Sequence, residues 1–204
     1  MKDIDGNVYK TITIGTQTWM AENLRVTKYR NGDTIGTTYP PLKDISLENA
    51  PKYQWAPEGR INYVPIYGRL YTWYTVTDSR NVCPVGWHLP DNLEWTTLDN
   101  YLSGDTICVA KKLKEKTGFN ATDMIHWCSS GCINQSGFTA LPNCDRSDIG
   151  GWGDGTFCSV GYWWCNYEEN ITNSYARELV YLSDDLELIS MSKRSGLSVR
   201  CIKD

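Results

Sequence analysis

The sequence predicts a single α+β domain that combines two central helices with short antiparallel strands and long loops. Helical periodicity is confined to the middle of the chain, and short apolar runs typical of strands occur toward both ends. No long polar linker divides the 204 residues, a length that supports one sizeable hydrophobic core. We therefore expect one domain over residues 1–204, with a strand pair at 1–24, a helical middle at 83–118 and a loop-rich β part at 136–204.

The first twenty residues predict a pair of strands. Val8, Ile12 and Ile14 occupy alternate positions, which places these three apolar side chains on one face of an extended segment. Tyr9 is out of phase with them, so we expect it on the opposite face. A glycine turn follows, and the segment 17–20 returns as the second strand.

A long irregular segment is expected at residues 28–65. Its composition shifts to Asn, Gly, Pro, Thr and Tyr, with Pro40 and Pro41 near the centre. Coil of this length inside one domain is typical of a functional loop or of a segment that wraps around the core. The composition alone leaves both alternatives open.

The strongest helix signal begins at Asp91. Asp91 is a good N-cap residue, and Glu94 three positions later completes the pattern of a capping box. Trp95, Leu98 and Leu102 follow at helical spacing and therefore share one face. A Ser-Gly pair then ends the predicted helix.

A second helix is predicted from about residue 107 to 116. Its apolar residues recur at helical spacing, and a glycine follows the segment. Three lysines fall on the other side of this helix, namely Lys111, Lys112 and Lys114. We expect all three lysines to lie in solvent.

The charge balance and the apolar pattern exclude two classes of partner. Twenty basic and 24 acidic residues give a net charge of -4, which offers no positive field for nucleic acid. No apolar run approaches the length of a membrane-spanning helix, so we expect no membrane insertion by this segment. Residues 1–6 lack the apolar core of a signal peptide, so we expect the leader of a secreted form to lie outside this sequence.

No motif in the sequence calls for a metal or another cofactor. The His-Glu-x-x-His, Walker and Gly-x-Ser-x-Gly motifs are absent. The glycine-rich segment 151–155 precedes no helix, so it lacks the helix N-terminus that binds phosphate. Oxygen-rich residues at 143–154 could hold calcium, but no EF-hand spacing supports this. We therefore expect no catalytic residue, no metal and no cofactor.

A domain of this length does not need disulfides merely to fold. Its eight cysteines are nevertheless more than a typical cytosolic enzyme carries, and they indicate an oxidising compartment. The sequence leaves many pairings open. Cys128 and Cys132 are four residues apart and form one candidate pair. Zinc binding by these cysteines with His126 is disfavoured, because a structural zinc site needs a fourth soft ligand.

The densest aromatic segment is 161–168, which contains Trp163 and Trp164 in succession. Adjacent residues of a strand point to opposite faces, so we expect one of these rings in the core and the other partly accessible. Accessible aromatic rings with polar neighbours can stack on sugars or peptides. This pattern gives six candidate ligand-binding residues: Trp152, Asp154, Trp164, Asn166, Tyr167 and Glu168.

Several segments, in this order, resemble one family. Residues 3–24 resemble the opening of the Fibrobacter succinogenes major paralogous domain, and 83–98 resemble its central motif. The segments 136–142, 162–164 and 196–201 resemble its last third. This family occurs in secreted and surface proteins of gut and rumen bacteria. It resembles, more distantly, the C-type-lectin-like fold and the formylglycine-generating sulfatase-modifying enzymes.

The resemblance implies a C-type-lectin-like domain in which Cys83 is paired with Cys201. It further implies ligand recognition on the long-loop face. The Glu-Pro-Asn, Gln-Pro-Asp and Trp-Asn-Asp motifs of calcium-dependent lectins are absent, so metal-dependent sugar binding is not implied. Cys201 matches a structural cysteine of the family rather than the reactive cysteine of the oxidases.

The sequence thus favours a non-enzymatic binding domain that is secreted or displayed on the bacterial outer surface, for example on a lipoprotein. We expect it to recognise an extracellular glycan or protein through the loops between about residues 145 and 168. One alternative is a thiol oxidoreductase similar to the sulfatase-modifying enzymes, using Cys128, Cys132 or Cys158. Another alternative is a structural or adhesin module without a small ligand.

Overall fold

The computed structural model describes residues 1–115, 127, 131–143, 145–153, 159–181 and 183–204. The strands are β1 (Thr11–Ile14), β2 (Gln17–Met20), β3 (Gln54–Trp55), β4 (Leu70–Tyr71), β5 (Trp87–His88), β6 (Val160–Glu168), β7 (Asn173–Val180), β8 (Glu187–Ser192) and β9 (Ile202–Lys203). The α-helices are α1 (Val64–Tyr67), α2 (Trp73–Val76), α3 (Asn92–Leu102) and α4 (Val109–Leu113), and two 3-10 turns cover Pro57–Gly59 and Ile61–Tyr63. The protein is therefore of the mixed α+β class.

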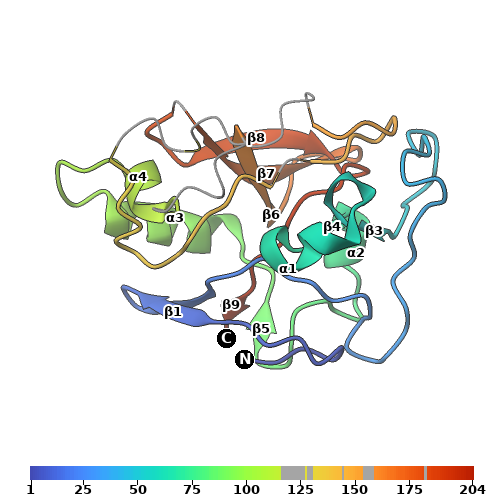
Figure 1. The fold of residues 1–204 in the computed structure, drawn as a ribbon, viewed down its shortest axis with the longest axis horizontal. Helices are drawn as coiled ribbons and strands as arrows, with labels where there is room; N and C mark the ends of the chain where they lie inside the picture. The colour runs from blue at the N-terminus through green and yellow to red at the C-terminus, as the bar shows by residue number, and fades with distance from the viewer. Residues whose placement is uncertain (116–126, 128–130, 144, 154–158, 182) are drawn as a thin grey trace.

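The strands form three small antiparallel sheets. Their orders are β1-β2-β9-β5, β3-β4 and β6-β7-β8. In the view of Figure 1 the β6-β7-β8 sheet lies at the top and the β1-β2-β9-β5 sheet lies at the bottom, on the side of the two chain ends. Helices α3 and α4 lie at one end of the molecule, and α1 and α2 lie toward the other.

The predicted N-terminal strand pair is present as β1 and β2, but the face assigned to Val8 and Tyr9 is wrong. Val8 is 67% exposed and forms an isolated bridge with Lys2, whereas Tyr9 is buried. The Tyr9 hydroxyl donates to Asp3 over 2.6 Å and accepts from the Arg25 backbone N–H over 2.8 Å. Because its one polar atom is paired in this way, the Tyr9 ring can enter the core.

Helix α3 forms as predicted. The Asp91 carboxylate accepts from the Glu94 backbone N–H over 2.8 Å, and the Glu94 carboxylate accepts from the Asp91 backbone N–H over 2.9 Å. These two bonds complete the capping box. Trp95, Leu98 and Leu102 are buried, so the predicted apolar face of the helix packs on the core.

Helix α4 is shorter than predicted, and two lysines of the predicted helix, Lys112 inside α4 and Lys114 just after it, are buried rather than solvated. Lys112 is 4% exposed and Lys114 is 2% exposed. The Lys112 ammonium donates to the Leu102 carbonyl at the end of α3, and the Lys114 ammonium donates to the Val180 carbonyl over 2.7 Å. These buried ammonium groups are tolerated because they donate hydrogen bonds to backbone carbonyls at the ends of α3 and β7.

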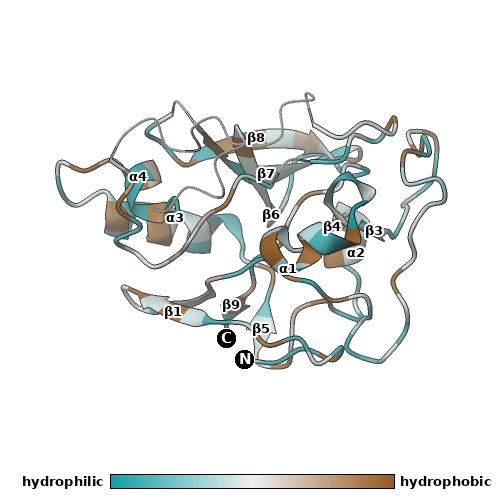
Figure 2. Ribbon diagram, in the orientation of Figure 1, coloured by the Kyte–Doolittle hydropathy of each residue, from teal (hydrophilic) through white to brown (hydrophobic). Residues whose placement is uncertain are grey.

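Strand β6 lies between two hydrophobic clusters. Trp164 belongs to the cluster that includes Tyr71, and Trp163 belongs to the cluster that includes Trp95. Both indoles are fully buried, so the expectation that one of them is accessible is wrong. Both faces of β6 are buried because each face packs on a different hydrophobic cluster. Figure 2 shows apolar residues along α1, α3 and α4 and also within the loops.

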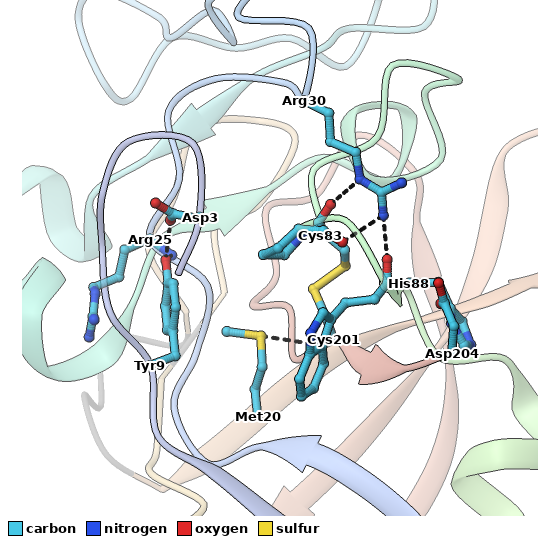
Figure 3. The surroundings of a disulfide bond; sticks show 11 residues. Asp3, Tyr9, Met20, Arg25, Arg30, Cys83, His88, Cys201 and Asp204 are labelled. Atoms are coloured by element: carbon cyan, nitrogen blue, oxygen red, sulfur yellow. Dashed lines mark hydrogen bonds and ion pairs between the residues drawn. A yellow bond between two sulfur atoms is a disulfide. The ribbon is translucent and has the colours of Figure 1, made fainter. Parts of the chain in front are cut away.

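The disulfide implied by the family resemblance is confirmed. Cys83 and Cys201 are bonded with an S–S distance of 2.05 Å, and Figure 3 shows their surroundings. The Arg30 guanidinium donates to the carbonyls of Cys83, Pro84 and Trp87, which anchors the segment before β5. The bond therefore ties the middle of the chain to its last strand.

The predicted pairing of Cys128 with Cys132 stays a prediction. Cys132 takes part in a disulfide, whereas Cys128 lies outside the described residues. Among the described residues, Cys108 and Cys165 are free thiols.

His88 in β5 lies between two carboxylates. Its Nδ1 atom is 2.6 Å from Asp204 Oδ1, and its Nε2 atom is 2.8 Å from Glu94 Oε1. Burial disfavours the charged imidazole, but the hydrogen bonds to Asp204 and Glu94 outweigh this effect and raise the pKa of His88 above 6.5. Through these contacts the His88 ring links β5 to the first turn of α3 and to the end of the chain.

This arrangement predicts a pH-dependent stability. A pKa that is higher in the folded state gives a stabilisation that is complete below the unfolded pKa and is lost as the pH rises through the folded pKa. We expect the difference in free energy of unfolding between wild type and a His88→Gln variant to shrink as the pH rises above about 6.5. Urea unfolding at several pH values measures this difference. A difference that stays constant would show that the carboxylates do not retain the proton.

Candidate functional site

The turn after β8 holds two surface loops in place. This turn covers residues 192–196. The Ser192 hydroxyl donates to the Asp148 carboxylate over 2.9 Å, and the Arg194 guanidinium donates to the Glu48 carbonyl over 2.8 Å. One short turn thus fixes two loops that lie about a hundred residues apart in the sequence.

The same turn fixes the hairpin between β6 and β7. Lys193 is 2% exposed, and its ammonium is paired with the Glu168 carboxylate and donates to the Asn170 carbonyl over 2.5 Å. The ammonium also lies 4.5 Å from the centre of the Trp73 ring. Glu168 therefore anchors the hairpin in addition to lying at the surface.

A buried arginine joins the first two loops to each other. Arg146 is fully buried, and its guanidinium lies 4.2 Å from the centre of the Trp55 ring. It donates to the carbonyls of Pro41 over 3.0 Å and Ser147 over 2.9 Å, and also to that of Lys43. Burial lowers the pKa of Arg146 from its usual value. The guanidinium thus replaces water as the partner of loop carbonyls.

We call the three loops held by this network the loop face. It consists of residues 39–49, 145–153 and 167–172. Large apolar side chains of these loops remain in solvent, although the backbone beneath them is hydrogen-bonded. They are Tyr39 (94% exposed), Leu42 (50%), Leu47 (97%), Ile149 (68%) and Ile171 (86%). Large exposed apolar side chains on hydrogen-bonded loops make these loops a candidate interaction surface.

The loop face includes three of the residues predicted from the sequence. Trp152 is half-buried, and its backbone pairs with that of Arg146. The Tyr167 ring is 45% exposed and stacks on Tyr175, with ring centres 4.8 Å apart. Glu168, the third of these residues, is exposed and paired with Lys193 as described above.

The other three predicted residues do not join this surface in the described structure. Trp164 is fully buried and its indole N–H donates to the Tyr71 carbonyl over 2.6 Å, so its assignment to a binding site is wrong. Asn166 is exposed, and its backbone N–H donates to the Pro90 carbonyl over 2.8 Å, next to the start of α3. Asp154 lies outside the described residues.

Sequence reasoning missed the apolar residues of the first loop and of the hairpin. The only signal for the first loop was the long irregular composition of residues 28–65, which suggested a functional or wrapping segment without naming side chains. Ile171 stands between polar residues and carried no pattern of its own. Exposure of single apolar residues depends on tertiary contacts that composition does not contain.

The described thiols offer little support for redox chemistry. Burial raises the pKa of Cys165 to about 12, which keeps its sulfur protonated and unreactive. Cys108 is partly exposed, and its thiol donates to the Asp184 carboxylate over 3.0 Å. Of the thiols considered for an oxidoreductase, Cys132 is already in a disulfide, and Cys128 and Cys158 lie outside the described residues.

Neither a metal cluster nor a membrane span occurs in the part of the chain that the structure describes. No group of three or more His, Cys, Asp and Glu side chains there could hold a metal ion. No helix formed by the described residues is long and apolar enough to cross a membrane.

The fold and its surface define a disulfide-linked α+β domain with small antiparallel sheets and an ordered apolar loop face. The chain belongs to the Fibrobacter succinogenes major domain family (Fib_succ_major), whose family model matches residues 12–203. No curated protein matches the chain, and no solved structure matches it.

Proposed function

We propose that this protein is a non-enzymatic binding domain whose loop face recognises an extracellular protein. The observation that carries the proposal is the exposure of Leu47, Ile149 and Ile171 on loops that are all fixed by one buried turn. Apolar anchors on a rigid support lose little conformational entropy when a partner covers them. Covering these exposed aliphatic side chains with a partner would contribute favourable hydrophobic free energy.

The aliphatic character of the loop face favours a protein over a glycan at this surface. A sugar ring is recognised by flat aromatic faces and by hydrogen-bonding groups that fix its hydroxyls. The exposed anchors here are mostly leucine and isoleucine, and the Glu168 carboxylate is already paired. Binding of a glycan at the loop face would therefore contradict the proposal.

A secreted or surface location and a C-type-lectin-like fold belong to the same proposal. The Cys83–Cys201 disulfide supports an oxidising compartment. Long loops carried by small sheets, with a disulfide near the end of the chain, are compatible with a lectin-like arrangement. The oxidoreductase alternative needs a reactive thiol, and Cys132, one of its three candidates, is already in a disulfide.

The test uses a double variant of the loop face and a matched control. Leu47→Asp combined with Ile149→Asp places charge on two exposed anchors, whereas Val85→Asp does the same at an 85% exposed position away from the three loops. Wild type is used to select peptides from a phage-displayed library, and it is also screened against purified extracellular proteins. We expect selected binders to lose affinity at least about tenfold for the double variant and to retain it for the control.

Four results would overturn the proposal. Binders that tolerate the double variant would place recognition elsewhere on the molecule. Binders that are lost equally with Val85→Asp would indicate a nonspecific effect of charge. Failure to select any peptide or protein, with retention on a neutral polysaccharide column instead, would favour the glycan alternative. Failure in both formats would favour the structural module.

A further inference from the structure

A cavity of about 440 Å³ opens at the α3–α4 end of the molecule, among elements separate from the loop face. Its volume lies within the range of small-molecule binding sites. It lies between the β1–β2 turn, the end of α3 and residues 135–136. Its lining includes Thr13, Gly15, Tyr101, Asp105, Lys112 and Gln135.

Lys112 brings a buried cation to the wall of this cavity. A lysine ammonium has three N–H donors. The ammonium of Lys112 is held by the Leu102 carbonyl and by the Asp105 carboxylate, 2.7 Å away. Among the described residues these are its acceptors, so one donor remains for a ligand. The Lys112 side chain is 5% exposed.

Asp105 balances the charge of Lys112. Its Oδ1 atom accepts from the Ile107 backbone N–H over 2.8 Å and is paired with Lys112. The hydrogen bonds from Lys112 and from the Ile107 N–H lower the pKa of Asp105, so its carboxylate stays ionised near neutral pH. One positive and one negative group leave the cavity wall without net charge. A neutral ligand that both donates and accepts hydrogen bonds fits such a pair better than an ion does.

Tyr101 adds an aromatic surface to the same cavity. Tyr101 is 61% exposed. Gly15 packs on it so closely that a Cβ atom at this glycine would lie 2.9 Å from Tyr101 Cδ2. Gly15 also has a φ of +60°, a conformation that side chains rarely adopt. The lack of a side chain at Gly15 therefore lets the Tyr101 ring pack against the β1–β2 turn.

We propose that this cavity binds one pyranose unit of a neutral glycan. The C–H face of a sugar ring packs on Tyr101, and its hydroxyls bond the Asp105–Lys112 pair. The polar side chains of Thr13 and Gln135 at the rim provide further donors and acceptors. The combination of an exposed aromatic ring, a charge-balanced pair and polar side chains matches a polyol better than an apolar molecule or an anion. This inference does not depend on the protein partner proposed for the loop face.

The test measures binding of defined sugars to the whole protein. Cellobiose, maltose, lactose and mannobiose serve as neutral probes, and digalacturonate serves as an acidic probe, each by isothermal titration and saturation-transfer NMR. We expect at least one neutral disaccharide to bind and digalacturonate to bind more weakly. We expect Tyr101→Ala and Asp105→Asn each to weaken that binding about tenfold.

Two controls separate this site from the rest of the molecule. Leu93→Ala changes a 71% exposed residue of the same helix that does not line the cavity, and it is expected to leave sugar affinity unchanged. The Leu47→Asp/Ile149→Asp variant is also expected to keep full sugar affinity. The proposal is overturned if no neutral disaccharide binds, if binding survives both cavity variants, or if digalacturonate binds best. Sugar binding that is lost only with the loop-face variant would also overturn it.

Discussion

Replacing both Cys83 and Cys201 with alanine is expected to lower the free energy of unfolding by about 5 kcal/mol. The bond spans 118 residues, and the stabilisation from restricting the unfolded chain increases with the length of the closed loop. Both sulfurs are buried, so alanine keeps an apolar environment and introduces no unpaired polar group. For a chain of this length the loss corresponds to a decrease in Tm of roughly 10–20 °C.

Urea unfolding of the double alanine variant measures this effect, and Cys108→Ala is the matched control. Cys108 is a free cysteine, so its substitution leaves the covalent connectivity intact. We expect the control to differ from wild type by less than about 1 kcal/mol. A double variant as stable as the control would mean that the native contacts of Arg30 and β9 hold the chain end without help from the bond.

Local signals predicted local structure well. The capping box of α3 involves Asp91 and Glu94, which are three residues apart, and its apolar face follows from helical spacing alone. The β1–β2 pair is likewise set by alternation around a short turn. The Cys83–Cys201 disulfide was predicted from the family resemblance and not from spacing, because its two cysteines are 118 residues apart.

The sequence-based predictions failed where contacts between distant segments decide whether a side chain is buried. Lys114 has the sequence context of a solvated helix residue, yet its ammonium bonds the Val180 carbonyl, 66 positions along the chain. Burial lowers the pKa of Lys114 to about 8, which reflects this enclosure. The loop face was predicted only as a region, because its order depends on Arg146 and the turn at 192–196 rather than on the loops' own composition.

Trp164→Ala is expected to destabilise the protein by about 3–5 kcal/mol, although the sequence pattern suggested a binding role for this residue. The indole is fully buried, so truncation leaves a cavity beside Tyr71 and removes the hydrogen bond to its carbonyl. Trp164→Phe keeps most of the apolar contact and is expected to lower the free energy of unfolding by about 1 kcal/mol.

Tyr167→Ala, at an exposed position of the same strand, is the control, and its free energy of unfolding is expected to stay within about 1 kcal/mol of wild type. Urea unfolding ranks the three variants. A Trp164→Ala variant of unchanged stability would show that the ring reaches solvent, and β6 would then have only one buried face.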